Sequence, residues 1–195
     1  YPDGFSDALF PNIGYTYLIN LGTPFIMQVA EKKFSMKTDG FLPRNKSIEC
    51  YHCAGNKLFG IKFKISPIIF KTKVNFGEYR EYIYPLSYLM EQSVIDRAKK
   101  ATSFDERVQI LNNYFQSIVE NYTGSWEPIR IVSEILEHCN SKNDFTTSVE
   151  DFAKQYTISA RTLHRYFETT TSLSSKKALQ ILRIRKAVQQ LVNAP

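Results

Sequence analysis

The segment Ser148-Val-Glu-Asp-Phe-Ala-Lys-Gln-Tyr-Thr-Ile-Ser-Ala-Arg-Thr-Leu-His-Arg-Tyr-Phe167 contains two short helical patterns separated by a tight turn. Ser148 stands three residues before Asp151, a spacing in which the serine oxygen can accept a hydrogen bond from an unpaired first-turn N–H. Apolar residues then recur at helical spacing, and Ser159 can cap a second helix. This is the pattern of a helix-turn-helix, whose second helix enters the major groove of DNA.

The outward face of the second helix supports this interpretation. Arg161, His164, Arg165 and Glu168 fall at i, i+3, i+4 and i+7, so they line one exposed stripe. Arginine is well suited to a bidentate contact with guanine in the major groove. The alternative is a solvated charged face on an ordinary helical hairpin, which many proteins have.

The residues that follow carry a family resemblance. Ser159-Ala-Arg-Thr-Leu-His-Arg-Tyr-Phe167 matches the pattern S-x-R-x-L-x-R-x-F, and Arg183, Ala187 and Leu191 match R-x-x-x-A-x-x-x-L. Over about residues 131–191 the chain resembles the AraC/XylS family of bacterial transcription activators. In that family these patterns mark the first helix-turn-helix and the connecting helix after it. The resemblance implies a transcription regulator that binds double-stranded DNA, usually as a homodimer, in the cytoplasm.

The resemblance also implies roles for individual residues. Arg161, His164 and Arg165 would face the base edges. A second set would contact the DNA backbone or contribute general positive potential: Ser159, Thr162, Lys176, Lys177, Arg183, Arg185 and Lys186.

Three features depart from the family pattern. Thr157 stands at the turn position that is often glycine, and a β-branched residue is unfavourable at positive φ. The usual glycine after the recognition helix is replaced by Ser172, so either turn is expected to be looser or differently shaped. The family's DNA-binding unit carries two helix-turn-helix motifs, and this chain ends at Pro195, just after the connecting helix, without the second.

The positive charge of the chain lies at its C-terminal end. Residues 159–195 contain seven Lys or Arg and one acid, whereas the other 158 residues carry 18 basic and 18 acidic side chains. A positive field confined to the recognition and connecting helices suits binding to phosphates. A basic solubilising tail is the alternative.

The N-terminal part predicts antiparallel β structure, so the expected fold class is α+β. With 43% hydrophobic residues, the 195-residue chain should be globular. Short runs rich in Tyr, Phe, Ile and Val favour a small barrel or sandwich. The predicted strands are Tyr15–Leu21, Phe25–Ala30, Ser47–Cys53 and Leu58–Ile65, and the predicted turns are Asn20–Pro24, Thr38–Asn45 and Ala54–Lys57.

The N-terminal part contains Tyr1-Pro-Asp-Gly-Phe5 and the strand-like Phe59-Gly-Ile-Lys-Phe-Lys64, followed by a short helix with Pro67. With these features residues 1–75 resemble, more weakly, the cupin-like sensor domain of some members of the same family. The resemblance implies a pocket for a small-molecule effector or a surface for dimerisation. Aromatic side chains in this part could line such a pocket or simply form the core; they are Phe5, Phe10, Tyr15, Tyr17 and Phe25.

Helices are expected at residues 86–100, 103–122 and 127–139, and a short helix containing Pro67 is expected before them. They predict three parts: a β-rich sensor domain at 1–85, linking or dimerisation helices at 86–125, and a helix-turn-helix domain at 126–195. The linking helices could contact a second copy of the chain or pack against their own β domain.

The sequence carries little sign of catalysis, of a cofactor or of a metal. No glycine-rich phosphate loop, G-x-S-x-G elbow or H-E-x-x-H motif is present. Cys50-Tyr-His-Cys53 has metal-ligand types, but on a strand only Cys50 and His52 share a face, and structural zinc wants four ligands. No apolar run is long enough to span a membrane. The competing function is a module that binds a small molecule or a protein and has no DNA affinity of its own.

Overall fold

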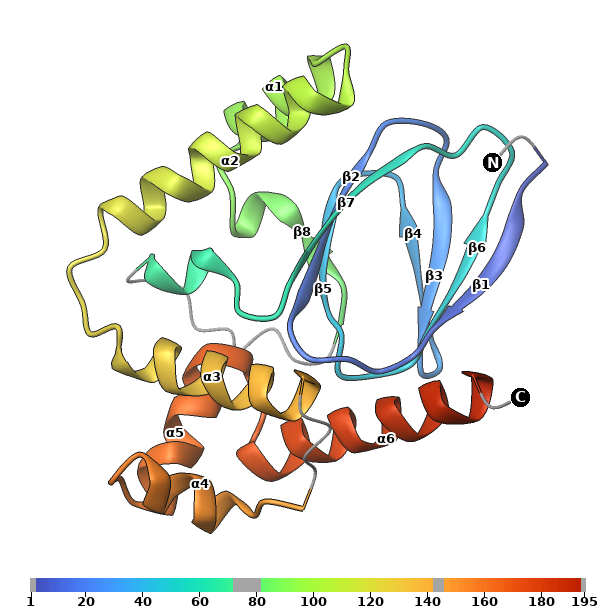
Figure 1. The fold of residues 1–195 in the computed structure, drawn as a ribbon. Helices are drawn as coiled ribbons and strands as arrows, with labels where there is room; N and C mark the ends of the chain where they lie inside the picture. The colour runs from blue at the N-terminus through green and yellow to red at the C-terminus, as the bar shows by residue number, and fades with distance from the viewer. Residues whose placement is uncertain (1–2, 72–81, 142–145, 194–195) are drawn as a thin grey trace.

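A computed structural model describes residues 3–71, 82–141 and 146–193 of the chain. Two antiparallel β-sheets form one half of the molecule and six α-helices surround and extend it, so the α+β fold class is confirmed (Figure 1). The helix α6 runs along one edge of the strands, and α1 with α2 lies on another side of them (Figure 1). We call the described part of residues 3–120 the β unit, and the described part of residues 127–193 the helical unit.

The first sheet has the strand order β1-β6-β3-β4. Its strands are β1 (Phe5–Leu9), β3 (Phe25–Val29), β4 (Lys32–Met36) and β6 (Ile48–His52). The second sheet has the order β7-β2-β5-β8. Its strands are β2 (Tyr15–Asn20), β5 (Gly40–Pro43), β7 (Leu58–Phe63) and β8 (Tyr84–Pro85). The register sets Phe5 opposite His52 in the first sheet, and Tyr15 opposite both Pro43 and Phe63 in the second.

The inner faces of the two sheets enclose one apolar core. Phe25, Met27 and Ile48 of the first sheet are buried against Leu42 of the second. A second apolar core lies on the other face of the second sheet. Side chains alternate along β2, so Tyr15, Tyr17 and Ile19 point into this core and away from the first sheet. These side chains pack under the helices α1 (Gln92–Lys100) and α2 (Phe104–Glu120). The helices before the linker therefore pack on their own β-sheet.

The strand predictions are confirmed where a hydrophobic run was long, and one turn prediction is wrong. β2, β3, β6 and β7 coincide with the four predicted strands to within two residues at each end. The segment Thr38–Asn45 is not a turn, because Gly40–Pro43 forms β5 between β2 and β8. Phe41 and Leu42 are both buried, on opposite faces of a sheet that is covered on both sides. Such a strand lacks the alternation on which the prediction relied.

The predicted helix at 86–100 begins later than expected. A 3-10 turn occupies Leu86–Tyr88, and α1 begins only at Gln92. The other helix predictions are confirmed: a 3-10 turn spans Pro67–Phe70, α2 spans Phe104–Glu120, and α3 spans Glu127–Ser141. Ser103 caps α2 by accepting a hydrogen bond from the backbone N–H of Glu106.

The helical unit packs α3, α4 (Val149–Gln155), α5 (Ala160–Thr171) and α6 (Ser175–Asn193) around one core. Ile131, Ile135, Phe152 and Phe167 are at most 2% exposed at its centre. The same core contains Ile13, which lies two residues before β2. The β unit and the helical unit therefore share buried apolar surface.

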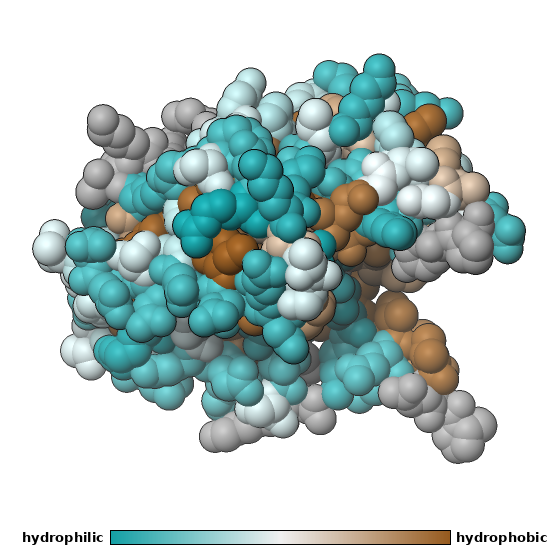
Figure 2. Space-filling view, turned by 90° about the horizontal axis from the view of Figure 1, so that it is seen from above, coloured by the Kyte–Doolittle hydropathy of each residue, from teal (hydrophilic) through white to brown (hydrophobic). Residues whose placement is uncertain are grey.

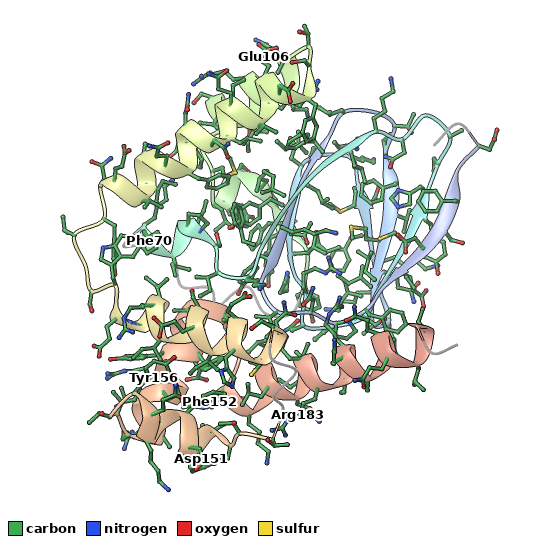
Figure 3. All side chains as sticks on the ribbon, viewed as in Figure 1. Phe70, Glu106, Asp151, Phe152, Tyr156 and Arg183 are labelled. Carbon is green, nitrogen blue, oxygen red and sulfur yellow. The ribbon has the colours of Figure 1, made fainter. Side chains whose placement is uncertain are left out.

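An aromatic cluster closes the connection between α2 and α3. The Phe70 ring lies 4.5 Å from that of Tyr122 and 4.8 Å from that of Trp126, measured between centroids. Figure 3 shows Phe70 on its short helix beside this connection. Contact among these three rings stabilises the path of the chain from one unit to the other, although Trp126 is 46% exposed.

Candidate DNA-binding surface

The two predicted helices of the helix-turn-helix are present and each carries its own cap. At α4 the Ser148 hydroxyl oxygen accepts from the Asp151 N–H at 3.0 Å, and the Asp151 carboxylate accepts in return from the Ser148 N–H at 3.4 Å. At α5 the Ser159 oxygen accepts from the Thr162 N–H at 3.0 Å. These contacts satisfy backbone donors that a helix start otherwise leaves unpaired.

The two helices cross through small and apolar side chains. Phe152, Ala153 and Leu163 are buried between α4, α5 and α3, and Ile158 in the turn packs partly against them. Figure 3 shows Phe152 inside the helical unit and Asp151 at its outer edge. Burial and a hydrogen bond with Glu134 raise the pKa of Tyr156 to about 12, and this hydrogen bond joins the C-terminal cap of α4 to α3.

Both unusual turn residues adopt the left-handed conformation that glycine normally occupies. Thr157 has φ 56° and Ser172 has φ 60°. At both positions the backbone therefore has the positive φ that glycine would supply, although neither residue is glycine. Left-handed backbone costs a non-glycine residue on the order of 1 kcal/mol, which the surrounding packing must offset.

The predicted base-reading side chains form one open stripe on α5. Arg161, His164 and Arg165 are all exposed. The His164 Nε2 lies 3.5 Å from a Glu168 carboxylate oxygen, and the Arg165 guanidinium lies over the ring of Tyr166 at 5.9 Å. At the C-terminal end of α5, the Ser172 hydroxyl is hydrogen-bonded to the Tyr15 hydroxyl of the β unit, away from these three side chains. The stripe is therefore accessible to a large partner.

The predicted backbone-contacting residues divide into two groups. Ser159 and Thr162 lie in the first turn of α5, next to the stripe, where their hydroxyls lie 2.9 Å apart. Lys176 and Arg183 are exposed and seven residues apart, hence on one face of α6. Figure 3 shows Arg183 projecting on the side of α6 that faces away from the strands.

Lys177, Arg185 and Lys186 lie where α6 borders the β unit. They line a cavity of about 550 Å³ between α6 and the loop before β2. Its walls are mainly apolar, with Phe10, Ile13, Leu136, Ile181, Ile184 and Val188 among the lining residues. The structure therefore separates these three cations from Lys176 and Arg183, a division that spacing along one helix did not reveal.

Two arginines hold the loop at the mouth of this cavity. Arg44 Nη2 donates to the Phe10 carbonyl at 3.4 Å, and Arg185 Nη1 donates to the Pro11 carbonyl at 3.1 Å. Arg44 is only 8% exposed, and burial, followed by the charge of Arg185, lowers the pKa of its guanidinium. Arg44 was not among the predicted site residues, because it follows a strand that was predicted as a turn.

The aromatic residues considered for a pocket have different surroundings. Tyr15, Tyr17 and Phe25 are buried in the two cores of the β unit, whereas Phe10 is 63% exposed and lines the cavity. Phe5 stacks on His52, with ring centroids 4.5 Å apart. Of the five, Phe10 is the one that borders the cavity.

The Cys50–Cys53 segment comprises the end of β6, an inner strand of the first sheet, and the residue that follows it. His52 lies between Phe5 and Phe25, and its Nδ1 is 2.8 Å from the Asn56 Oδ1. Burial raises the pKa of the Cys50 thiol to about 11, while Cys53 is exposed. Within the described residues, no three His, Cys, Asp or Glu side chains gather where they could hold a metal.

The surface seen from above is mostly hydrophilic, with hydrophobic residues in separate patches (Figure 2). Among the helices of the described residues, none has both the length and the apolar character to cross a membrane.

Comparison with known proteins finds no matching family model and no matching curated protein. Three solved structures illustrate the fold-level likeness. ToxT from Vibrio cholerae is 10% identical, covers 100% of this chain and 82% of its own, and has a TM-score of 0.47. Wild-type ToxT from Vibrio cholerae strain SCE256 with a bound unsaturated fatty acid is 8% identical. The match covers 100% of this chain and 79% of that ToxT chain, with a TM-score of 0.49. The AraC-like transcriptional activator CuxR is 10% identical, with coverages of 96% and 74% and a TM-score of 0.41. Identities and TM-scores this low indicate a likeness of fold and do not assign a function to this chain.

Proposed function

We propose that the chain is a DNA-binding transcription regulator of the AraC type, acting in the cytoplasm. The observation that supports this most is the open stripe of Arg161, His164 and Arg165 on the second helix of a capped helix-turn-helix. Arginine side chains on such a helix can donate paired hydrogen bonds to guanine. The fold alone does not imply this function, since one fold hosts many functions.

The charge around the stripe suits contact with the DNA backbone. Lys176 stands in the first turn of α6, where the free N–H groups and the helix dipole also attract phosphate. Arg183 lies two turns further along the same face. In this proposal α5 reads bases while the start of α6 and the start of α5 hold the backbone.

Selection from a random duplex library at two salt concentrations tests the proposal. The wild-type chain should enrich a short sequence, and a variant with Arg161, His164 and Arg165 all changed to Ala should not. The matched control is Lys57→Ala with Lys62→Ala, which removes the same number of formal positive charges from exposed positions of the β unit. If the control loses enrichment as fully as the triple variant, net charge and not the stripe is responsible.

Single substitutions separate base reading from backbone contact. Arg165→Ala should cost about 1–3 kcal/mol on the selected sequence and relax the preference at one position. Lys176→Ala should weaken binding to all sequences alike and lower the slope of log affinity against log salt by about 1. Equal losses on selected and random DNA for Arg165→Ala would contradict its assignment to a base.

A second function is favoured by the cavity between α6 and the β unit. Its volume of about 550 Å³ lies within the ordinary range for small-molecule sites. Apolar walls with Lys177, Arg185, Lys186 and Lys64 at the same cavity suit an amphiphilic anion. We therefore include effector binding in the proposal, and effector binding without any DNA affinity is the competing function.

Thermal unfolding with alkyl carboxylates and with alcohols of equal chain length tests the cavity. A ligand that binds only the folded chain raises its melting temperature. The carboxylate should raise it more than the alcohol, and Ile184→Glu should abolish the difference by placing a negative charge in the apolar wall. A rise of the same size in the Ile184→Glu variant would show that the ligand binds elsewhere.

A further inference from the structure

The turn that ends α5 contains a residue in an unfavourable conformation. Ser172 is the C-terminal cap, with φ 60° and ψ 16°, and its N–H donates to the Glu168 carbonyl. Glycine takes this conformation without a steric cost, whereas serine does not. Ser172 is also buried, with 3% of its surface exposed. A strained, buried serine at this position calls for a compensating contact.

The contact comes from the β unit. The Ser172 hydroxyl is hydrogen-bonded to the phenolic hydroxyl of Tyr15, the first residue of β2. Tyr15 is 1% exposed, so both hydroxyls are removed from water and the loss of either would leave the other without this partner. A glycine at 172 would relieve the backbone but could not make this bond.

The turn at Ser172 also sets the relation between α5 and α6. Further hydrogen bonds fix the residues on either side of Ser172. The hydroxyls of Thr170 and Thr171 donate to carbonyls of the preceding turn, and the Thr171 oxygen accepts from the Leu173 N–H. Only two residues separate Ser172 from the first residue of α6. The direction of this turn therefore determines how the stripe on α5 lies relative to Lys176 and Arg183 on α6.

We infer that Tyr15 is a positioning residue for DNA recognition: through Ser172 it holds the recognition helix at the angle to α6 that base contacts require. The inference rests on the proposed function. On this inference the β unit contributes to DNA reading, because a hydroxyl on β2 is hydrogen-bonded to the residue that ends α5. Because the stripe itself stays exposed, the contact orients α5 without covering it.

Tyr15→Phe tests the inference, and Tyr17→Phe is its matched control. Tyr17 lies two residues along the same strand, is fully buried, and pairs its hydroxyl with Ser66 inside the β unit. Tyr15→Phe should lower affinity for the selected sequence about fivefold, with affinity for random DNA changed by less than about twofold. Tyr17→Phe should leave both affinities unchanged. A gain in affinity for Tyr15→Phe, or equal effects of the two variants, would overturn the inference.

Ser172→Gly removes the hydroxyl and also removes the unfavourable backbone conformation of serine. A loss of DNA affinity in this variant is therefore not explained by loss of folding. It should lower specific affinity as Tyr15→Phe does without lowering the melting temperature, and the double variant should bind no worse than either single one. Wild-type affinity in a folded Ser172→Gly chain would overturn the inference.

Amide hydrogen exchange separates failure of this inference from failure of the proposed function. Tyr15→Phe should speed exchange in the last turn of α5, at residues 168–172, and Tyr17→Phe should not. If selection finds no preferred DNA sequence, the proposed function fails, and this exchange pattern then decides whether Tyr15 orients α5. Equal exchange in the two variants would overturn the positioning role even if the chain binds DNA.

Discussion

The β unit and the helical unit differ in how far apart their stabilising partners lie in the sequence. In the helical unit a serine stands at the start of α4, of α5 and of α6, and each accepts a backbone hydrogen bond from three residues away. In the β unit β1 pairs with β6, and Gly40 of β5 pairs with Pro85 of β8. Helix positions in this chain therefore depend on local residues, whereas strand pairing depends on residues far apart in the sequence.

The units also differ in charge. All of the net charge lies in residues 159–195, and the remainder of the chain is balanced. Yet the buried surfaces are shared, through Ile13 in the helical core and through the bond between Tyr15 and Ser172. The difference between the units is therefore one of surface chemistry more than of independent stability, and the following substitutions test this.

The largest effect is expected for Phe167→Ala. The side chain is 0% exposed at the centre of the helical core, and truncation of a buried phenylalanine costs about 3–5 kcal/mol of unfolding free energy. Denaturation followed by the fluorescence of Trp126 and by circular dichroism measures it, since Trp126 is the single tryptophan. Coincident curves would show that the units unfold together. Two separated transitions would show that the helical unit unfolds alone, which would contradict the view that the two units are stable only together.

A smaller loss is expected in the β unit for Asp39→Ala. The Asp39 carboxylate accepts from the Asn20 N–H at 2.8 Å and from Lys99 Nζ at 3.1 Å, which ties β2 to α1. Hydrogen bonds to a buried charged group are worth about 2 kcal/mol. Lys99→Met should cost less, because the lysine side chain is 36% exposed. Urea denaturation of both variants measures the difference, and a larger loss for Lys99→Met would contradict the dominance of the Asn20 contact.

Ser148→Ala should lower stability by about 1 kcal/mol, the usual effect of losing an N-terminal cap. The same change at Ser47, an exposed serine beside β6, should have little effect. Urea denaturation compares the two. A Ser148→Ala chain as stable as wild type would show that packing of Phe152, and not the local cap, places the start of α4.

The smallest effect, and one of opposite sign, is expected for Thr157→Gly. Thr157 is exposed and has φ 56°, so glycine removes steric strain at the cost of greater freedom in the unfolded chain. The net gain should be about 0.5–1 kcal/mol. Thr157→Ala keeps a Cβ and should gain less. Thermal unfolding of both variants checks the order.

Prediction from the sequence succeeded where the signal was local. The capping box at Ser148, the cap at Ser159 and the apolar stripe between them located α4 and α5, and alternation in Gly60–Ile65 indicated β7. It failed at β5, where Phe41 and Leu42 are buried on both faces of a sheet and show no period. It expected looser turns at Thr157 and Ser172, whereas both residues adopt positive φ; of the two, Ser172 is buried and hydrogen-bonded to the distant Tyr15.

The candidate surface was predictable in part for the same reason. Helical spacing was enough to place Arg161, His164 and Arg165 on one exposed stripe, since a helix repeats every 3.6 residues whatever surrounds it. Only the tertiary structure decided that Lys177, Arg185 and Lys186 border a cavity with the β unit while Lys176 and Arg183 do not. It alone decided that Tyr15 meets Ser172, because a hydrogen bond across 157 positions depends on how separate elements pack and leaves no periodic trace in the chain.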